Sequence, residues 1–112
     1  MYKIFGINNC NTVKKAINHL DNAGIKYEFI NFKKTAPTKE QIKIWKDAFG
    51  DWPVNKKGPT YRKIKEEFEA AAASTKYKIL METTSAIKRP ILMKGKKVML
   101  FGYDEEAYGK LK

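Results

Sequence analysis

The strongest constraint on the fold is a strand–helix–strand pattern in residues 2–32. Residues 2–7, YKIFGI, are mostly aromatic or β-branched and lead into polar turn residues, so they predict a strand. Apolar residues then recur at spacings of three and four, as on one face of a helix, at Val13, Ala16, Ile17 and Leu20. Gly24 ends that helix, and residues 26–32, KYEFINF, predict a second strand. Such a connection usually places its strands in parallel with a right-handed crossover, which predicts an α/β protein.

The middle of the chain predicts helices separated by short breaks. Thr38 and Gln41 have the spacing of a capping box, and Gly50 ends the helix that they begin. Ile42, Trp45 and Phe49 are expected to lie on one face of this helix. Pro53, Gly58 and Pro59 then mark a loop.

Two further helices are expected before residue 88. One runs from about Thr60, with Ile64, Phe68 and Ala71 inward, and the alanines of residues 70–73 favour helix by propensity. The other is capped by Ser74 or Thr75, and its inward face is expected to carry Ile79, Leu80, Thr83 and Ile87.

After Pro90 the pattern of apolar residues changes from that of helices to that of strands. Residues 91–93 and 98–101 are apolar runs around KGKK, which is a hairpin signal, and Asp104 can cap a last short helix. Tyr103 and Tyr108 have the spacing of a hydrophobic staple. The order β-α-β, helices, β-β-α fits a four-stranded mixed sheet covered by helices.

Size and composition favour one compact domain in a reducing cytoplasm. The 112 residues suit a single domain, and 43% hydrophobic residues suffice for one core. The start lacks the apolar run of a signal peptide, and no stretch approaches the roughly 20 apolar residues of a membrane helix. One cysteine cannot form an intramolecular disulfide framework. We therefore expect a cytoplasmic monomer with no membrane association.

The charge is strongly positive, at +11 from 23 Lys and Arg against 12 Asp and Glu. Such a surplus attracts anions and can give weak nucleic-acid binding. Lysines are scattered through every segment, which instead favours a solvated lysine-rich surface.

The cysteine at position 10 stands between the first strand and the first helix. Unpaired N–H groups and the positive end of the helix dipole gather there, so the pKa of the Cys10 thiol should fall below about 8.5. Nearby polar and cationic residues that can support a thiolate are Asn9, Asn11, Thr12, Lys14 and Lys15. Free cysteines are often buried and structural, but these polar neighbours argue against a core position. Because the chain has no second cysteine, a catalytic cycle would need an outside thiol such as glutathione.

Two other segments are candidate anion sites. Arg89, directly before Pro90, could clamp an oxyanion by bidentate hydrogen bonds, although a surface arginine entering an edge strand is the alternative. Two lysines, of which Lys57 is the second, precede Gly58 at a helix start and could present their charge to an anion, although solvated lysines give the same pattern. His19 lacks carboxylate or cysteine partners, so no metal site is expected.

The chain resembles the arsenate reductase (ArsC)/Spx family. The segments that carry the resemblance are FGINNCNTVKKA, NKKGPTYRKI, AIKRPIL and GKKVMLFGYDEEAY, in family order over essentially the full chain. The similarity is closest to the branch of Spx-type regulators and small glutathione-dependent reductase homologues of the YffB type.

The resemblance implies a thioredoxin-like fold, with residues 1–35 and 88–112 as the core and 36–87 as a helical insertion in a single domain. It places the nucleophile on Cys10, the anion-binding arginine on Arg89 and a cis-proline on Pro90. Lys57 stands where the family often has an arginine, and a lysine cannot supply the bidentate fork.

The resemblance implies a thiol-dependent oxidoreductase that acts on an oxyanion or a small thiol adduct, with no bound cofactor and glutathione or another small thiol as co-substrate. The alternative is an Spx-like regulator that binds the C-terminal domain of the RNA polymerase alpha subunit. Many such regulators carry a C-x-x-C switch, which the CNTV of residues 10–13 lacks.

Overall fold

The computed structural model describes residues 2–7 and 10–111 of the chain. The chain divides at residues 32/33 and 88/89 into two compact units, and we call the described residues up to 32 and from 89 the sheet unit and residues 33–88 the helical unit. Within the described residues, no helix combines the length and the apolar character that crossing a membrane requires.

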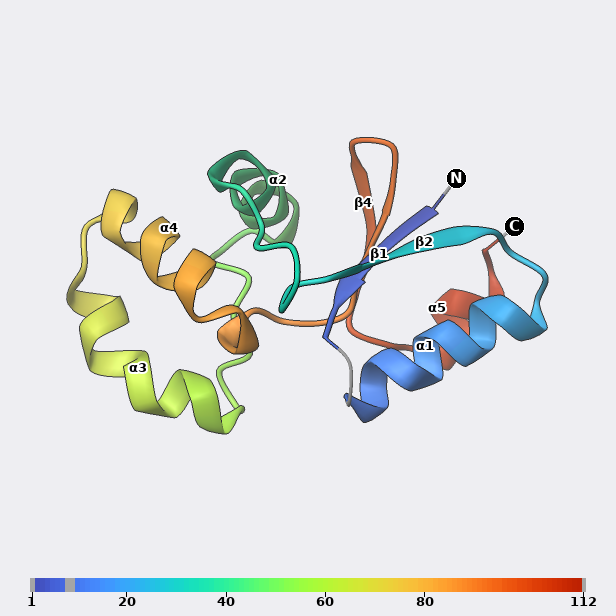
Figure 1. Ribbon diagram of the computed structural model, residues 1–112, viewed down its shortest axis with the longest axis horizontal. Coiled ribbons are helices and arrows are strands. Elements are labelled where there is room, and N and C mark those ends of the chain that lie inside the picture. Colours follow the sequence, from blue (N-terminus) through green and yellow to red (C-terminus); the bar gives the residue numbers. More distant parts are fainter. Residues whose placement is uncertain (1, 8–9, 112) are drawn as a thin grey trace. The chain divides into compact units, whose positions relative to one another are not determined.

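The sheet unit contains a four-stranded mixed sheet and two helices (Figure 1). In chain order its elements are β1 (Tyr2–Gly6), α1 (Asn11–Asn22), β2 (Tyr27–Asn31), β3 (Ile91–Lys94), β4 (Lys97–Phe101) and α5 (Glu105–Gly109). The strand order is β2-β1-β3-β4, with β1 parallel to β2 and antiparallel to β3, and with β3 and β4 forming a hairpin. The predicted strand–helix–strand start, the hairpin and the mixed sheet are therefore confirmed.

Helices α1 and α5 cover one face of this sheet (Figure 1). Their shared core contains Tyr2, Ile4, Ala16, Leu20, Leu92 and Tyr108, all buried. Tyr2 and Ile4 are two positions apart on β1, so both side chains point to the same face. The rings of Tyr103 and Tyr108 lie 4.9 Å apart between centroids, and Asp104 caps α5 by accepting the N–H of Glu106. The contact between Tyr103 and Tyr108 is the predicted hydrophobic staple.

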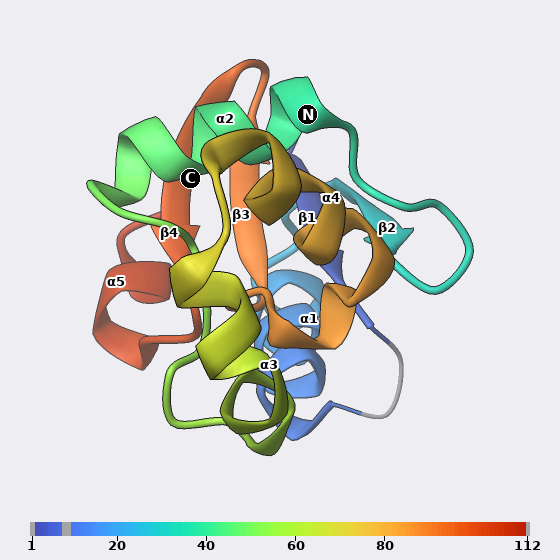
Figure 2. The ribbon, with the colours of Figure 1, turned by 90° about the vertical axis from the view of Figure 1, so that its left-hand side faces the viewer.

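The helical unit consists of three helices and a short 3₁₀ turn (Figure 2). They are α2 (Lys39–Phe49), α3 (Pro59–Ala70), α4 (Ala73–Glu82) and the turn Thr84–Ala86. The capping box of Thr38 and Gln41 forms as predicted, and Gly50 ends α2 at a φ of 84°. Such a positive φ is costly for residues other than glycine.

The structure differs from the sequence analysis at several places in the helical unit. Phe49 is 40% exposed because it is the last residue of α2, beyond the buried Ile42 and Trp45. The third helix begins at Ala73, with Ala72 as its N-cap, rather than after Ser74 or Thr75. Ala71 and Ala72 are extended, so the chain breaks inside an alanine run that propensity alone would make helical.

Candidate active site

Cys10 is the N-cap residue of α1 and has extended backbone angles (φ −110°, ψ 119°). Its carbonyl accepts the backbone N–H of Lys14 at 2.9 Å, which opens the helix, and its side chain is half-buried. The first N–H groups of an α-helix have no partner within the helix and carry partial positive charge. The sulfur therefore lies where an anion is stabilised.

Glycine at position 6 allows the end of β1 to approach the first turn of α1 closely. A Cβ atom on Gly6 would lie 2.8 Å from Cγ2 of Val13, closer than packed carbons come, and Val13 is buried. The absence of a Cβ atom at position 6 therefore permits the close packing of Val13 against the end of β1, three residues after Cys10.

Burial and three neighbouring residues act on the pKa of the Cys10 thiol. Burial is the largest single influence and raises the pKa, because desolvation disfavours the thiolate. The backbone N–H of Val13 opposes it, followed by the hydrogen bond and the charge of the Arg89 side chain and by the backbone N–H of Thr12. Together these groups outweigh burial, so the pKa of Cys10 lies below its ordinary value. More of the nucleophilic thiolate is then present at neutral pH than in free cysteine.

Arg89 reaches this cysteine from the far end of the sequence. The Arg89–Pro90 peptide bond is cis, Pro90 is fully buried, and its carbonyl accepts the N–H of Gly102 at 2.8 Å. Phe5 near the end of β1 pairs with Ile91 at the start of β3. This register carries the half-buried Arg89 to the end of β1 that leads to Cys10.

The other residues predicted to support the thiolate are Asn9, Asn11, Thr12 and Lys14. The side chains of Asn11, Thr12 and Lys14 are exposed on the first turn of α1, and Thr12 acts on the thiol through its backbone. The roles predicted for the Asn11 side chain and for the charge of Lys14 stay predictions, and Asn9 lies outside the described residues.

Lys57 belongs to the helical unit, in the turn directly before α3. Its side chain is exposed, and Gly58, which follows it, is the N-cap of that helix. The anion-binding role predicted for Lys57 stays a prediction.

No group of three His, Cys, Asp or Glu side chains in the described part of the chain could hold a metal ion. His19 instead packs between α1 and α5, with its Nδ1 3.4 Å from the hydroxyl of Tyr103.

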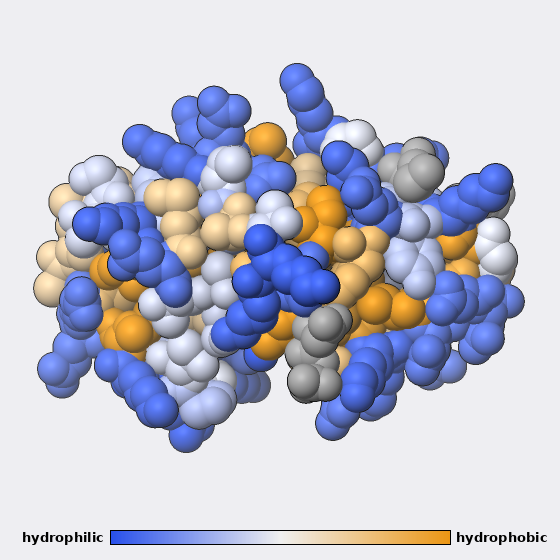
Figure 3. Space-filling view, in the orientation of Figure 1, coloured by the Kyte–Doolittle hydropathy of each residue, from blue (hydrophilic) through white to orange (hydrophobic). Residues whose placement is uncertain are grey.

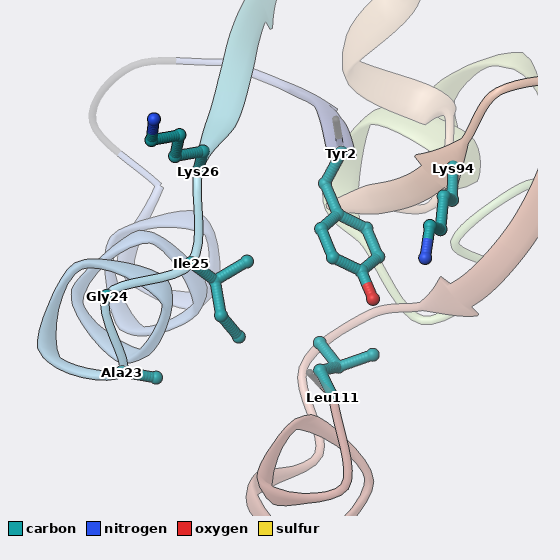
Figure 4. Close-up of a pocket in the computed structure, with 7 residues that line it drawn as sticks. All are labelled: Tyr2, Ala23, Gly24, Ile25, Lys26, Lys94 and Leu111. Carbon is teal, nitrogen blue, oxygen red and sulfur yellow. The ribbon is translucent and has the colours of Figure 1, made fainter.

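A cavity of about 500 Å³ lies elsewhere in the sheet unit, at the opposite end of β1 from Cys10. Figure 4 shows the Tyr2 ring beside Lys94, with its hydroxyl directed toward Leu111. The lining residues are Tyr2, Ala23, Gly24, Ile25, Lys26, Lys94 and Leu111. None of the predicted site residues lines this cavity, and no sequence pattern pointed to it.

The architecture and the site together define a thioredoxin-like thiol protein. The sheet order is β2-β1-β3-β4, a cysteine with a lowered pKa caps the first helix, and a cis-proline precedes the third strand.

Comparison with known proteins assigns the family. The protein-family model that is described as the ArsC family matches residues 5–111 of this chain. A Haemophilus influenzae protein described only as uncharacterized is 30% identical over 110 residues, which cover 96% of each chain. The chain therefore belongs to the ArsC family.

Solved structures agree with this assignment. A protein named YFFB is 32% identical, with a TM-score of 0.85, over 97% of this chain and 96% of its own. An arsenate reductase related protein from Brucella melitensis is 31% identical, with a TM-score of 0.74, over 98% of this chain and 95% of its own.

Proposed function

We propose that this protein is a thiol-dependent reductase in which Cys10 is the nucleophile and a small external thiol, such as glutathione, is the reductant. The observation that carries the proposal is the convergence of the α1 N-terminus and the Arg89 guanidinium on one half-buried thiol. A purely structural cysteine needs neither group. The names of several family relatives, which refer to arsenate reductase, support the same class of chemistry.

The proposed reaction on a mixed disulfide has two exchange steps. The Cys10 thiolate attacks the glutathionyl sulfur of the substrate, forms a Cys10–glutathione disulfide and expels the second thiol as thiolate. A second glutathione thiolate then attacks the glutathionyl sulfur on Cys10, releases the Cys10 thiolate and leaves as oxidised glutathione. Over the two steps the sulfur of the expelled thiol is reduced from disulfide to thiolate, and the sulfur of the second glutathione is oxidised from thiolate to disulfide, while the transferred glutathionyl sulfur stays in a disulfide throughout. Since every attacking or leaving sulfur is an anion, the positive charge of Arg89 favours both steps.

Steady-state reduction of two probes tests the proposal. One probe is a mixed disulfide of glutathione with a small thiol, the other is arsenate, and both are supplied with glutathione. We expect turnover of at least one probe by the wild-type protein and none by Cys10→Ser. Unchanged turnover in Cys10→Ser, or no turnover of either probe by the wild type, would contradict the proposal.

We rank the reductase ahead of the regulator that docks on RNA polymerase, because docking does not need a stabilised thiolate. A pull-down with the C-terminal domain of the polymerase alpha subunit at moderate salt separates the two. Specific capture by wild type and by Cys10→Ser, together with absent turnover, would favour the regulator.

A further inference from the structure

The helical unit carries a cluster of aromatic rings with lysine ammonium groups placed over them. The Trp52 ring lies 4.9 Å from the Tyr77 ring between centroids, in an edge-to-face arrangement. The Nζ of Lys46 lies 5.0 Å from the Trp52 centroid and that of Lys76 lies 5.8 Å away, while the Nζ of Lys39 lies 5.4 Å from the Tyr77 centroid. We call these five residues the aromatic–lysine cluster. They come from α2, α4 and the segment after α2, elements that face the viewer in Figure 2.

The three ammonium groups of this cluster can receive an anion. Among the described residues, none of Lys39, Lys46 and Lys76 takes part in a salt bridge. Two carboxylates line a small adjacent cavity of about 160 Å³, and both are engaged elsewhere. Asp51 pairs with Lys56, and Glu69 accepts the hydroxyl of Tyr61. A cation–π contact at a solvent-accessible site is weak, so an ammonium group can leave its ring for a phosphate.

The two aromatic rings of the cluster restrict the class of anionic molecule that can bind there. Trp52 and Tyr77 are half-buried, whereas Trp45 is fully buried. The Trp52 ring also lies 5.8 Å from the buried Phe68 ring, and its faces become available to a base when the ammonium groups move onto phosphates. The carboxylates of an acidic polypeptide would pair with the lysines, but they do not stack on aromatic rings. A nucleic-acid duplex would keep its bases inside the stack. A single strand can place phosphates on the ammonium groups and stack bases on the rings.

We propose that the aromatic–lysine cluster binds single-stranded nucleic acid. Hydrophilic side chains are spread over the face drawn in Figure 3. Lysines occur in every segment of the sequence, so positive charge alone does not mark the cluster. The cluster differs from that background because its cations lie directly over half-buried aromatic rings.

The first test measures how tightly a labelled oligothymidylate binds, as a function of salt. Three phosphate contacts on a single strand predict a roughly 18-fold loss of affinity between about 50 and 200 mM salt. The triple variant Lys39→Gln, Lys46→Gln, Lys76→Gln should bind on the order of tenfold more weakly, with a salt slope smaller by about 2. The matched control, Lys26→Gln, Lys96→Gln, Lys97→Gln, removes the same charge from exposed positions of the sheet unit and should bind almost as wild type. Equal losses in both variants, or no binding by wild type, would overturn the proposal.

The second test asks whether bases stack on the rings. Binding should quench tryptophan fluorescence, and Trp52→Phe should remove the quenching because Trp45 is buried. Tyr77→Leu gives an independent reduction of affinity if Trp52→Phe folds poorly. Competition by polyglutamate as effective as that by the oligonucleotide would show a site for acidic polypeptides and overturn the proposal. Cys10→Ser should bind the strand unchanged, which separates this surface from the proposed reductase site.

Discussion

The Arg89 guanidinium donates a hydrogen bond to the sulfur of Cys10, and its charge helps to lower the pKa of that thiol. The two residues are brought together by the pairing of β1 with β3, which joins the two ends of the sequence. This contact links the fold directly to the proposed chemistry, because it favours the thiolate over the thiol.

Replacing Arg89 should therefore raise the pKa of Cys10. We expect the midpoint of the pH dependence of iodoacetamide alkylation to move upward in Arg89→Gln, and less in Arg89→Lys, since a lysine keeps the charge but loses the planar fork. The control is Arg62→Gln, which removes the charge of an exposed arginine on α3. A midpoint that stays in place in Arg89→Gln would show that the guanidinium does not act on the thiol.

The lowered pKa also makes stability depend on pH. A thiol whose pKa is lower in the folded protein stabilises that state fully above the unfolded pKa of about 8.5. The contribution is lost as pH falls through the folded-state pKa. The difference in urea midpoint between wild type and Cys10→Ser should thus shift in favour of wild type as pH rises through this window. The opposite trend would mean that folding raises the pKa.

Adding one methyl group at position 6 should disturb the start of α1. The Cβ atom of Gly6→Ala would meet Val13 at 2.8 Å, so we expect a loss of about 1–3 kcal/mol in the free energy of unfolding. Gly109→Ala is the control, because a Cβ there meets nothing within 4 Å. Equal stabilities of the two variants, measured by urea denaturation, would show that β1 and α1 are not closely packed.

The hydroxyl of Tyr108 is buried without a hydrogen-bond partner among the described residues, and burial raises its pKa far above the ordinary value. Tyr108→Phe should therefore keep the wild-type stability or gain up to about 1 kcal/mol, because an unpaired buried polar group is removed. Tyr103→Phe removes the hydroxyl near His19 and should cost about 0.5–1.5 kcal/mol. A loss above 1 kcal/mol in Tyr108→Phe would show that its hydroxyl is bound in solution.

Local patterns in the sequence predict much of this fold. The spacing of Val13, Ala16 and Leu20 marks the buried face of α1, and the capping box at Thr38 marks the start of α2. The place of Cys10 at the start of α1 follows from the same patterns, because a strand ends and a helix begins around it.

Contacts between distant segments could not be predicted in the same way. The β1–β3 register that brings Arg89 to the thiol depends on pairing across most of the chain, and only the family resemblance had linked the two residues. The break at Ala71 and Ala72 runs against local propensity, so tertiary packing decides it. Tyr61, which is buried on α3, was also missed, because its phenol gives no clear apolar signal.

The most direct test of the central claim is the ionisation of the single thiol. The rate of alkylation of Cys10 in the native protein should be measured against pH, with the urea-unfolded protein as reference. We predict a midpoint clearly below that of the unfolded chain, because α1 and Arg89 stabilise the thiolate. A midpoint equal to or above the unfolded value would contradict the claim that this site is built to hold a nucleophilic sulfur.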